Sequence, residues 1–298
     1  MACFDETMKK LVPMQQFDHV GAALPLLREK LGGWKAYASA GVEEIYGDML
    51  KQTRQLQANC LETTVFLNRG SRFEARPLPI EAHMENTIKV FRSVRAEAMD
   101  LGVKIALENH SGDMQAREVR TIIEEAGKDL VAACLDNGNP IWCVEDPFVT
   151  LEILAPYVIT THVRDSVVFE DPRGAAGQWV ALGDGNVDLL RFVREFRRLC
   201  PQSSMQLEII TGRPPRILPY LEADFWMAFP KMPAWEFARF VALAKTGHPF
   251  MGAMVIEDVA GKRPPVMDEA LKEQQRIDLE RSFEYARKKL NVGVAWRA

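Results

Sequence analysis

Four short apolar stretches of the sequence each lead into a side chain that could bind a metal ion. These side chains are Glu108 in IALENH, Asp136 in CLDNGN, His162 in ITTHVRD and Glu208 in MQLEII. Three carboxylates and one imidazole suit a hard or borderline divalent ion, with positions left for water or substrate oxygens. If the stretches are parallel strands of one barrel, their carboxyl ends meet in one small region. The sequence therefore predicts one metal site, with Mn²⁺ as the expected ion and Mg²⁺, Co²⁺ or Zn²⁺ as alternatives.

Each of these side chains, taken alone, also has a purely structural interpretation. Glu108 could form a salt bridge at the end of its strand, and Asp136 could form an Asx turn with the Asn-Gly pair that follows it. A histidine such as His162 is more often a hydrogen-bonded core residue than a ligand. Four successive strands that each deliver a ligand type to the same region are hard to obtain by accident. The metal site is therefore the better interpretation of the set.

Short apolar runs rich in β-branched residues alternate with longer amphipathic segments from residue 60 onward, which is the pattern of repeated β-α units. The predicted strands are residues 61–67, 103–108, 131–136, 158–163 and 205–210. The predicted helices are residues 82–101, 115–126, 150–155 and 187–199. Residues 165–186 are interpreted as a long βα loop at the catalytic face. The expected fold class is therefore α/β, a TIM-type (β/α) barrel.

The two ends of the chain are less regular. Residues 1–59 contain two predicted helices, 21–31 and 42–58, but no predicted strand, although a full barrel needs about two more β/α units there. We therefore expect a barrel that is incomplete or irregular in its N-terminal units. Residues 213–298 contain a predicted helix at 233–245, a strand at 253–257 and a helix at 268–290, with Asp268 as its N-cap. This part is expected to close a single domain that spans residues 1–298.

Size and composition fit one globular domain, since 298 residues can hold a barrel of roughly 250 residues. The 37 basic and 41 acidic side chains give a formal net charge of -4 without a basic run, which argues against nucleic acid as a partner. Five cysteines without a CxxC pair indicate neither a disulfide framework nor a cysteine zinc site. The sequence lacks an apolar leader and any run of roughly 18 apolar residues, which disfavours secretion and membrane insertion. We expect a cytoplasmic homo-oligomer.

Three motifs carry a family resemblance: ENH at 108–110, LDNGN at 135–139 and HVRD at 162–165. Over about residues 60–212 the chain resembles the xylose-isomerase-like TIM-barrel superfamily, in particular its sugar (phosphate) isomerase and epimerase branch. That branch is related to inosose dehydratases and includes ketose 3-epimerases. The GDGNVD stretch at 183–188 and the LERSFEYARKKL segment are also similar to it. The resemblance implies that Glu108, Asp136, His162 and Glu208 bind one metal ion.

The resemblance also implies a reaction on a sugar or polyol. A metal that binds adjacent carbonyl and hydroxyl oxygens lowers the pKa of the intervening C–H bond by stabilising an enediolate. Glu108 and Glu208 are the expected proton-transfer pair, in addition to their role as ligands. Five further side chains are expected to contact substrate oxygens or to orient the ligands: Asn109, His110, Asn139, Arg164 and Asp165. A structural hydrogen bond is an equally good interpretation of these side chains.

The first hypothesis is therefore a metal-dependent isomerase or epimerase acting on a sugar. Ketose 3-epimerases of this branch carry an arginine six residues after the metal histidine, whereas this chain has Val168 there. A lyase that removes water or an aglycone from a keto-sugar, keto-glycoside or inosose needs the same proton removal and stays open. An endonuclease IV-like enzyme needs several histidines for a trinuclear zinc cluster. This chain has only five histidines in total and an acidic balance, which disfavours that alternative. A non-catalytic carbohydrate-binding or scaffold barrel also stays open.

Overall fold

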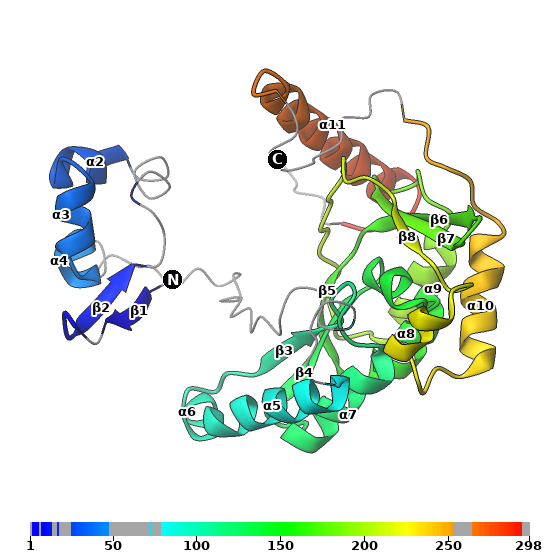
Figure 1. The fold of residues 1–298 in the computed structure, drawn as a ribbon, viewed down its shortest axis with the longest axis horizontal. Helices are drawn as coiled ribbons and strands as arrows, with labels where there is room; N and C mark the ends of the chain where they lie inside the picture. Colours follow the sequence, from blue (N-terminus) through cyan, green and yellow to red (C-terminus); the bar gives the residue numbers. More distant parts are fainter. Residues whose placement is uncertain are drawn as a thin grey trace. The chain divides into compact units, whose positions relative to one another are not determined.

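The computed structural model describes residues 2–5, 7–13, 17, 25–47, 72, 79–252 and 264–293. The chain divides into two compact units, Met1–Thr64 and Val65–Ala298. Figure 1 shows the elements of both units, coloured along the sequence. The strands predicted at 61–67 and 253–257 lie outside the described residues and stay predictions. Within the described residues, no helix has the length and apolar character needed to cross a membrane.

In its described residues, the N-terminal unit contains a β-hairpin and the short helices α2 to α4. Strand β1 (Ala2–Asp5) pairs antiparallel with β2 (Lys10–Pro13). The helices are α2 (Pro25–Leu31), α3 (Trp34–Ser39) and α4 (Val42–Tyr46). The buried side chains of this unit form a small core of Phe17, Leu27, Tyr37 and Ile45.

The prediction that residues 1–59 contain no strand is wrong. The two strands are only four residues long and antiparallel, so they lack the long apolar run that marks a buried parallel strand. The turn between them also lacks the glycine or asparagine that usually marks a hairpin. Lys9 adopts the positive φ there, 53°. Helix α2 ends at Leu31 and α4 begins at Val42, as predicted. Helix α4 already ends at Tyr46, however, before the predicted end at 58, and α3 was not predicted; residues 48–58 lie outside the described part.

The second unit is built on three parallel strands in the order of the sequence. They are β3 (Ile105–Glu108), β4 (Val131–Asp136) and β5 (Val158–His162). Every residue of the central strand β4 is buried, as expected for its apolar run before the terminal Asp136. The strand predicted at 205–210 is reduced to a single parallel bridge between Val163 and Leu207. Three of the five predicted strands are thus confirmed, while 61–67 lies outside the described residues.

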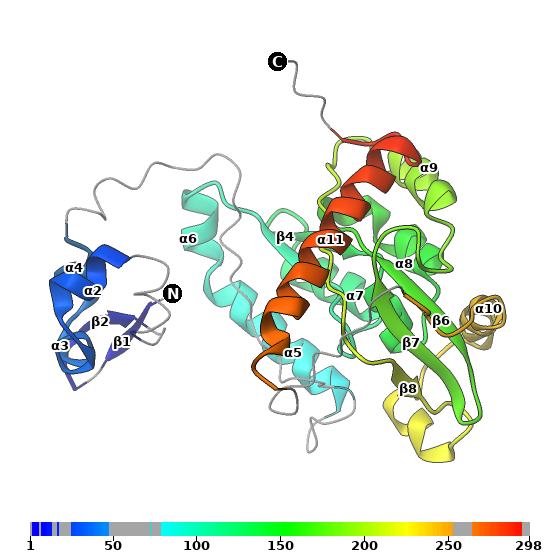
Figure 2. The ribbon, with the colours of Figure 1, turned by 90° about the horizontal axis from the view of Figure 1, so that it is seen from above.

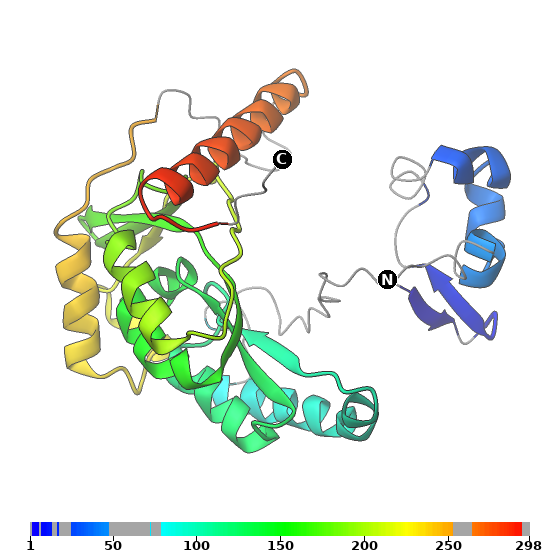
Figure 3. The same ribbon diagram turned by 180° about the vertical axis from the view of Figure 1, so that it is seen from behind.

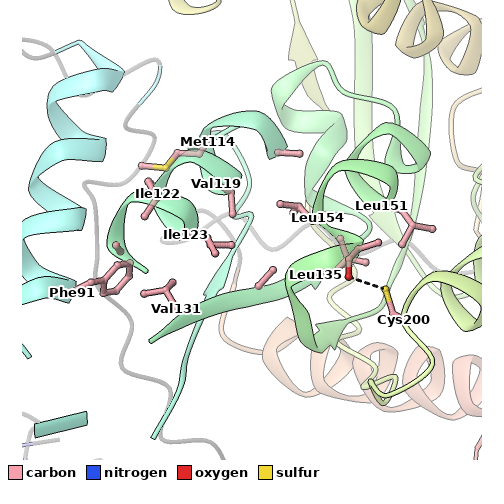
Figure 4. Packing of buried hydrophobic residues seen from close by; sticks show 14 of the residues in the cluster. Phe91, Met114, Val119, Ile122, Ile123, Val131, Leu135, Leu151, Leu154 and Cys200 are labelled. Carbon is pink, nitrogen blue, oxygen red and sulfur yellow. Dashed lines mark hydrogen bonds between the residues drawn. The ribbon is translucent and has the colours of Figure 1, made fainter. Parts of the chain in front are cut away.

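Helices that lie before, between and after these strands in the sequence pack against them. They are α5 (Ile80–Ser93), α6 (Arg95–Asp100), α7 (Ala116–Ala126), α8 (Pro147–Leu154) and α9 (Leu189–Leu199). Short 3₁₀ helices, η2 (Asn139–Cys143) and η3 (Ala155–Tyr157), flank α8. Figure 4 shows Ile122 and Ile123 of α7 beside Val131 of β4, and Leu154 of α8 beside Leu135. This packed layer removes β4 from water, whereas β3 and β5 stay partly exposed, and polar side chains lie at the carboxyl ends of the strands.

A β-hairpin occupies most of the predicted long loop at 165–186, so that prediction is wrong. Strand β6 (Asp165–Asp171) pairs antiparallel with β7 (Gly174–Val180), and β8 (Arg216–Leu218) joins the far side of β7. Figure 2 shows β6 and β7 side by side. Gly174 has a φ of 150°, and an added Cβ would lie 2.5 Å from the Leu218 carbonyl oxygen. The tight turn therefore requires glycine there.

The C-terminal part consists of η4 (Ala223–Ala228), α10 (Ala234–Ala244) and α11 (Met267–Lys288), which Figure 3 shows from behind. Phe225 and Phe229 are buried in an aromatic core under α10. The prediction of Asp268 as an N-cap is wrong, because Val266 occupies that position and Asp268 lies in the first turn. An aspartate there still faces the positive end of the helix dipole.

Glu145 is a buried carboxylate, 1% exposed, that joins two helices of the second unit. Its oxygens lie 3.1 and 3.2 Å from the Ala116 backbone nitrogen at the start of α7, and Thr150 Oγ1 of α8 donates to Oε2 at 3.1 Å. Burial raises the pKa of Glu145 to about 8, and the negative charges of Glu118 and Glu236 add to this effect. Ionising Glu145 in the folded chain therefore costs free energy.

We predict that the free energy of unfolding falls less steeply with rising pH in Glu145→Gln than in the wild type. The pKa of Glu145 rises on folding from 4.5 to about 8, so its stabilisation is full below about pH 4.5 and lost as pH rises through about 8. This group then lowers the free energy of unfolding by up to about 1.4 kcal/mol per pH unit between those values. Glutamine keeps an acceptor for Ala116 but cannot ionise. Urea unfolding at several pH values from 5 to 8 measures the two slopes.

Glu152→Gln is the matched control, because Glu152 lies on the same helix α8 with a side chain 54% exposed. This variant should keep the wild-type slope. Identical slopes for wild type and Glu145→Gln would contradict the prediction.

Candidate metal centre

Three of the four predicted ligands are the last residues of neighbouring parallel strands. Glu108 ends β3, Asp136 ends β4 and His162 ends β5. Because Asp136 lies opposite His162 in the parallel register, their side chains leave the sheet at the same edge. The Glu208 backbone nitrogen donates to the Val163 carbonyl at 2.9 Å, which brings the fourth residue to that edge. One ligand atom from each of the four lies within 4.8 Å of the others.

This spacing fits one divalent ion. Two ligand atoms on opposite sides of an ion, each bound at about 2.0 to 2.4 Å, are about 4.0 to 4.8 Å apart. The donor set of three carboxylates and one imidazole favours ions of hard or borderline character. With His162 neutral, as a histidine ligand must be, three ionised carboxylates beside the guanidinium of Arg164 leave two negative charges, which a divalent cation balances. Spacing, donor type and charge therefore agree.

Asp136 is the most deeply buried of the four, with 0% of its surface exposed. Its Oδ1 accepts hydrogen bonds from the backbone nitrogens of Gly138 (2.7 Å) and Asn139 (2.8 Å). Its Oδ2 lies 2.7 Å from Nη2 of Arg164. Burial raises the pKa of Asp136 to about 6, although Arg164 opposes the shift. The residue thus forms the Asx turn of the structural interpretation and still directs its second oxygen toward the cluster.

His162 lies between the two glutamates. Its Nδ1 is 3.2 Å from Oε1 of Glu108 and 3.2 Å from Oε2 of Glu208. Hydrogen bonds with Cys134, Glu108 and Glu208 raise the pKa of His162 above its usual value. Cys134 was not identified from the sequence. The signal was available, because Cys134 lies two residues before Asp136 and alternate residues of a strand share a face.

Arg164 bridges two of the predicted ligands. Its Nη2 contacts Oδ2 of Asp136 and Oε2 of Glu208, and its side chain is 3% exposed. Burial tends to raise the pKa of Glu208, but the hydrogen bond from His162 and the charge of Arg164 outweigh it and hold the pKa below its usual value. Arg164 is therefore an internal cation of the cluster, a role that the sequence did not distinguish from substrate contact.

The remaining predicted site residues lie around the centre in different ways. Asn139 donates from Nδ2 to Oε1 of Glu108 at 3.1 Å. Asn109 is buried and pairs with the backbone of Asp136, donating to its carbonyl at 2.7 Å and accepting from its nitrogen at 2.9 Å. The structure therefore brings Asn139 to the ligand cluster itself, whereas Asn109 acts on the backbone that carries a ligand.

His110 and Asp165 have contrasting environments. The side chain of His110 is 59% exposed, and its Nδ1 is 2.9 Å from Oδ2 of Asp113. The hydrogen bond with Asp113 raises the pKa of His110. Asp165 is buried, and its carboxylate accepts backbone N–H bonds from Gly183 (2.9 Å) and Gly185 (3.1 Å), which fixes the GDGNVD segment. His110 is thus open to a small molecule, whereas Asp165 supports a loop.

Residues 42–223 match the xylose isomerase-like TIM barrel family, which is more than half of the chain. The uncharacterized protein YihM of Escherichia coli K12 is 24% identical to this chain over 94 residues. Those residues are 32% of this chain and 28% of YihM. The match to the relative therefore covers only a part of each protein, whereas the family match includes all four cluster residues.

Two solved structures are also similar. A xylose isomerase-like TIM barrel protein from Mycobacterium smegmatis, in complex with magnesium, is 16% identical with a TM-score of 0.37, over 55% of this chain and 51% of that one. D-psicose 3-epimerase from Clostridium cellulolyticum H10, with D-tagatose, is 13% identical with a TM-score of 0.41, over 71% and 59%. This chain thus spans less than two thirds of the length of each.

The family match confirms the resemblance and the TIM-type fold class that the sequence predicts. The three described parallel strands, with their following helices, are the part of that fold that carries the candidate metal centre. On these grounds the chain belongs to the xylose isomerase-like TIM barrel family.

Proposed function

We propose that this protein is a divalent-metal-dependent isomerase or epimerase of a sugar or sugar derivative. The observation that carries the proposal is the cluster of Glu108, Asp136, His162 and Glu208 at the carboxyl ends of the parallel strands. In a (β/α) barrel this edge is where catalytic groups gather. A purely structural cluster would not need three carboxylates so close together, since each repels the others unless a cation balances them.

The four residues would hold one ion, with Mn²⁺ as the expected ion and Mg²⁺, Co²⁺ or Zn²⁺ as alternatives. A bound ion would supply Lewis-acid stabilisation for the negative charge that develops on adjacent substrate oxygens when a C–H proton is lost. Asp136 is fixed by backbone hydrogen bonds and has no freedom to move a proton over a distance. Glu108 and Glu208 are 26% and 37% exposed, so their carboxylates can reach both an ion and a small molecule.

Glu108 and Glu208 are the proposed proton-transfer pair. They approach His162 Nδ1 at equal distances of 3.2 Å. A carboxylate on each side of the substrate plane could remove a proton and return it, which is general acid-base catalysis. Of the other predicted contact residues, His110 is the most exposed and Asn139 lies directly against Glu108. We propose these two for substrate hydroxyl groups, with Asn109, Arg164 and Asp165 supporting the centre.

We further propose a cytoplasmic location and a homo-oligomer, as expected from the sequence. The location is supported by Cys134, Cys143 and Cys200, which are free and buried in the described part of the chain.

We predict that the wild-type protein binds one Mn²⁺ per chain and that Asp136→Asn weakens this binding by at least about 100-fold, more than the loss of an outer-shell group costs. The substitution preserves shape but removes the charge of the most buried ligand. Isothermal titration with Mn²⁺ gives stoichiometry and affinity. Thermal unfolding gives a second readout, because an ion that binds only the folded chain raises the melting temperature.

Asp188→Asn is the control for this experiment. Asp188 caps α9 through a 2.9 Å bond from the Arg191 nitrogen, and asparagine caps helices equally well. Its Mn²⁺ affinity should equal that of the wild type. A wild-type protein that binds no divalent ion, or an Asp136→Asn variant with full affinity, would refute the metal site.

We predict that Glu108→Gln and Glu208→Gln each lower turnover by about 100- to 10,000-fold at saturating Mn²⁺, the range of general acid-base catalysis. The assay screens ketoses, keto-glycosides and inososes in D₂O and follows deuterium incorporation by NMR and product mass by mass spectrometry. An isomer or epimer keeps the substrate composition apart from exchanged deuterium. Loss of water or of an aglycone would instead identify a lyase and contradict the first proposal. Glu152→Gln should keep full turnover.

A further inference from the structure

Arg164 is fixed at both its backbone and its side chain. The side-chain amide of Asn137 makes two hydrogen bonds with the backbone of Arg164. It accepts from the Arg164 nitrogen and donates to the Arg164 carbonyl, both at 2.9 Å. The side chain passes over Gly138, where an added Cβ would lie 2.3 Å from the Arg164 Cγ. Glycine in the DNGN segment therefore makes room for the arginine. These contacts aim the guanidinium at Asp136 and Glu208.

The other side of the guanidinium lies against an indole. The Cζ of Arg164 is 4.6 Å from the centroid of the Trp179 ring. Within the described residues, Nε and Nη1 of Arg164 are buried without a hydrogen-bond acceptor. The guanidinium lies over the face of the indole, a cation–π contact that stabilises a desolvated cation. Only Nη2 remains directed at the carboxylates.

Trp179 reaches this position through the β6–β7 hairpin. Strand β6 begins directly after Arg164, and the antiparallel register brings Trp179 opposite Ser166. A shift of the register by one residue would turn the indole to the other face of the hairpin. The edge of Trp142 supports Trp179 from the side, with ring centroids 5.3 Å apart and planes at 83°. The hairpin therefore holds the indole rigidly.

We propose that Trp179 is a positioning residue of the metal centre and acts through Arg164. The indole holds the guanidinium in the one orientation that bridges Asp136 and Glu208, and the bridge sets the spacing of these two ligands before an ion binds. This inference rests on the proposed metal site and extends it to a hairpin that contributes no ligand. Arg164 then serves the ligands and not the substrate, consistent with a side chain that is 3% exposed.

The test is a double-mutant cycle on Mn²⁺ and Co²⁺ affinity, measured by competition with a chromophoric chelator. We expect Trp179→Leu and Arg164→Met each to weaken binding by about 10- to 100-fold, as is usual for groups that orient metal ligands. The double variant should bind no more weakly than Arg164→Met alone, because the indole acts only through the arginine. Trp179→Phe should recover most of the affinity, since a phenyl face also holds a cation.

Trp226→Leu is the matched control. Trp226 packs in the same aromatic cluster, and its Nε1 donates to the Tyr220 carbonyl at 2.8 Å. This variant loses an indole without touching Arg164, so its metal affinity should be that of the wild type. Arg164→Lys keeps the charge and the packing volume near the indole; because an ammonium lacks the planar fork, it too should bind more weakly. It provides the test if Trp179→Leu does not fold.

Wild-type affinity in Trp179→Leu, or in Arg164→Lys, would overturn the inference. Additive losses in the double variant would also overturn it, because they would show that Trp179 affects the centre independently of Arg164. If the wild-type protein binds neither ion, the proposed metal site itself fails. Failure of the metal site can be told apart from failure of the Trp179 inference, because only the latter leaves metal binding by the wild-type protein intact.

Discussion

The structure of the candidate centre depends on one constraint, which is the complete burial of the Asp136 carboxylate. A buried carboxylate is costly unless hydrogen bonds and an opposite charge compensate it. Oδ1 meets two backbone N–H groups of the turn that follows β4, and Oδ2 meets Arg164. The turn, the arginine and the strand end are therefore fixed together. These contacts compensate the lost hydration of the carboxylate, and they also fix the direction in which Oδ2 points.

The same constraint links segments that are far apart in the sequence. Asn109, next to Glu108, holds the backbone of Asp136, and Asn137, next to Asp136, holds the backbone of Arg164. Each strand end thus positions the one that follows it. Polar residues beside the ligands in the ENH and LDNGN motifs are explained by these backbone bonds. They make the edge of the sheet rigid before any small molecule or ion is bound.

The sequence predicted the part of the site that depends on local pattern. Short apolar strands must be buried and parallel strands must end at one edge, so the ligand types at Glu108, Asp136, His162 and Glu208 could be read directly. The bridge by Arg164 was not predicted, because its orientation depends on Trp179, fifteen positions further along. That contact follows from the register of a hairpin that was interpreted as a loop. The N-terminal strands were missed for a related reason, since short antiparallel pairs carry little pattern.

The two glutamates of the centre are geometrically similar but electrostatically different. Both lie 3.2 Å from His162, yet Glu108 receives a hydrogen bond from the neutral amide of Asn139, whereas Glu208 contacts the cation of Arg164. Arg164 and His162 hold the pKa of Glu208 below its usual value. Once protonated, Glu208 would thus give up its proton more readily than an ordinary glutamic acid. The amide of Asn139 and the guanidinium of Arg164 thus give the two glutamates different partners in the cluster.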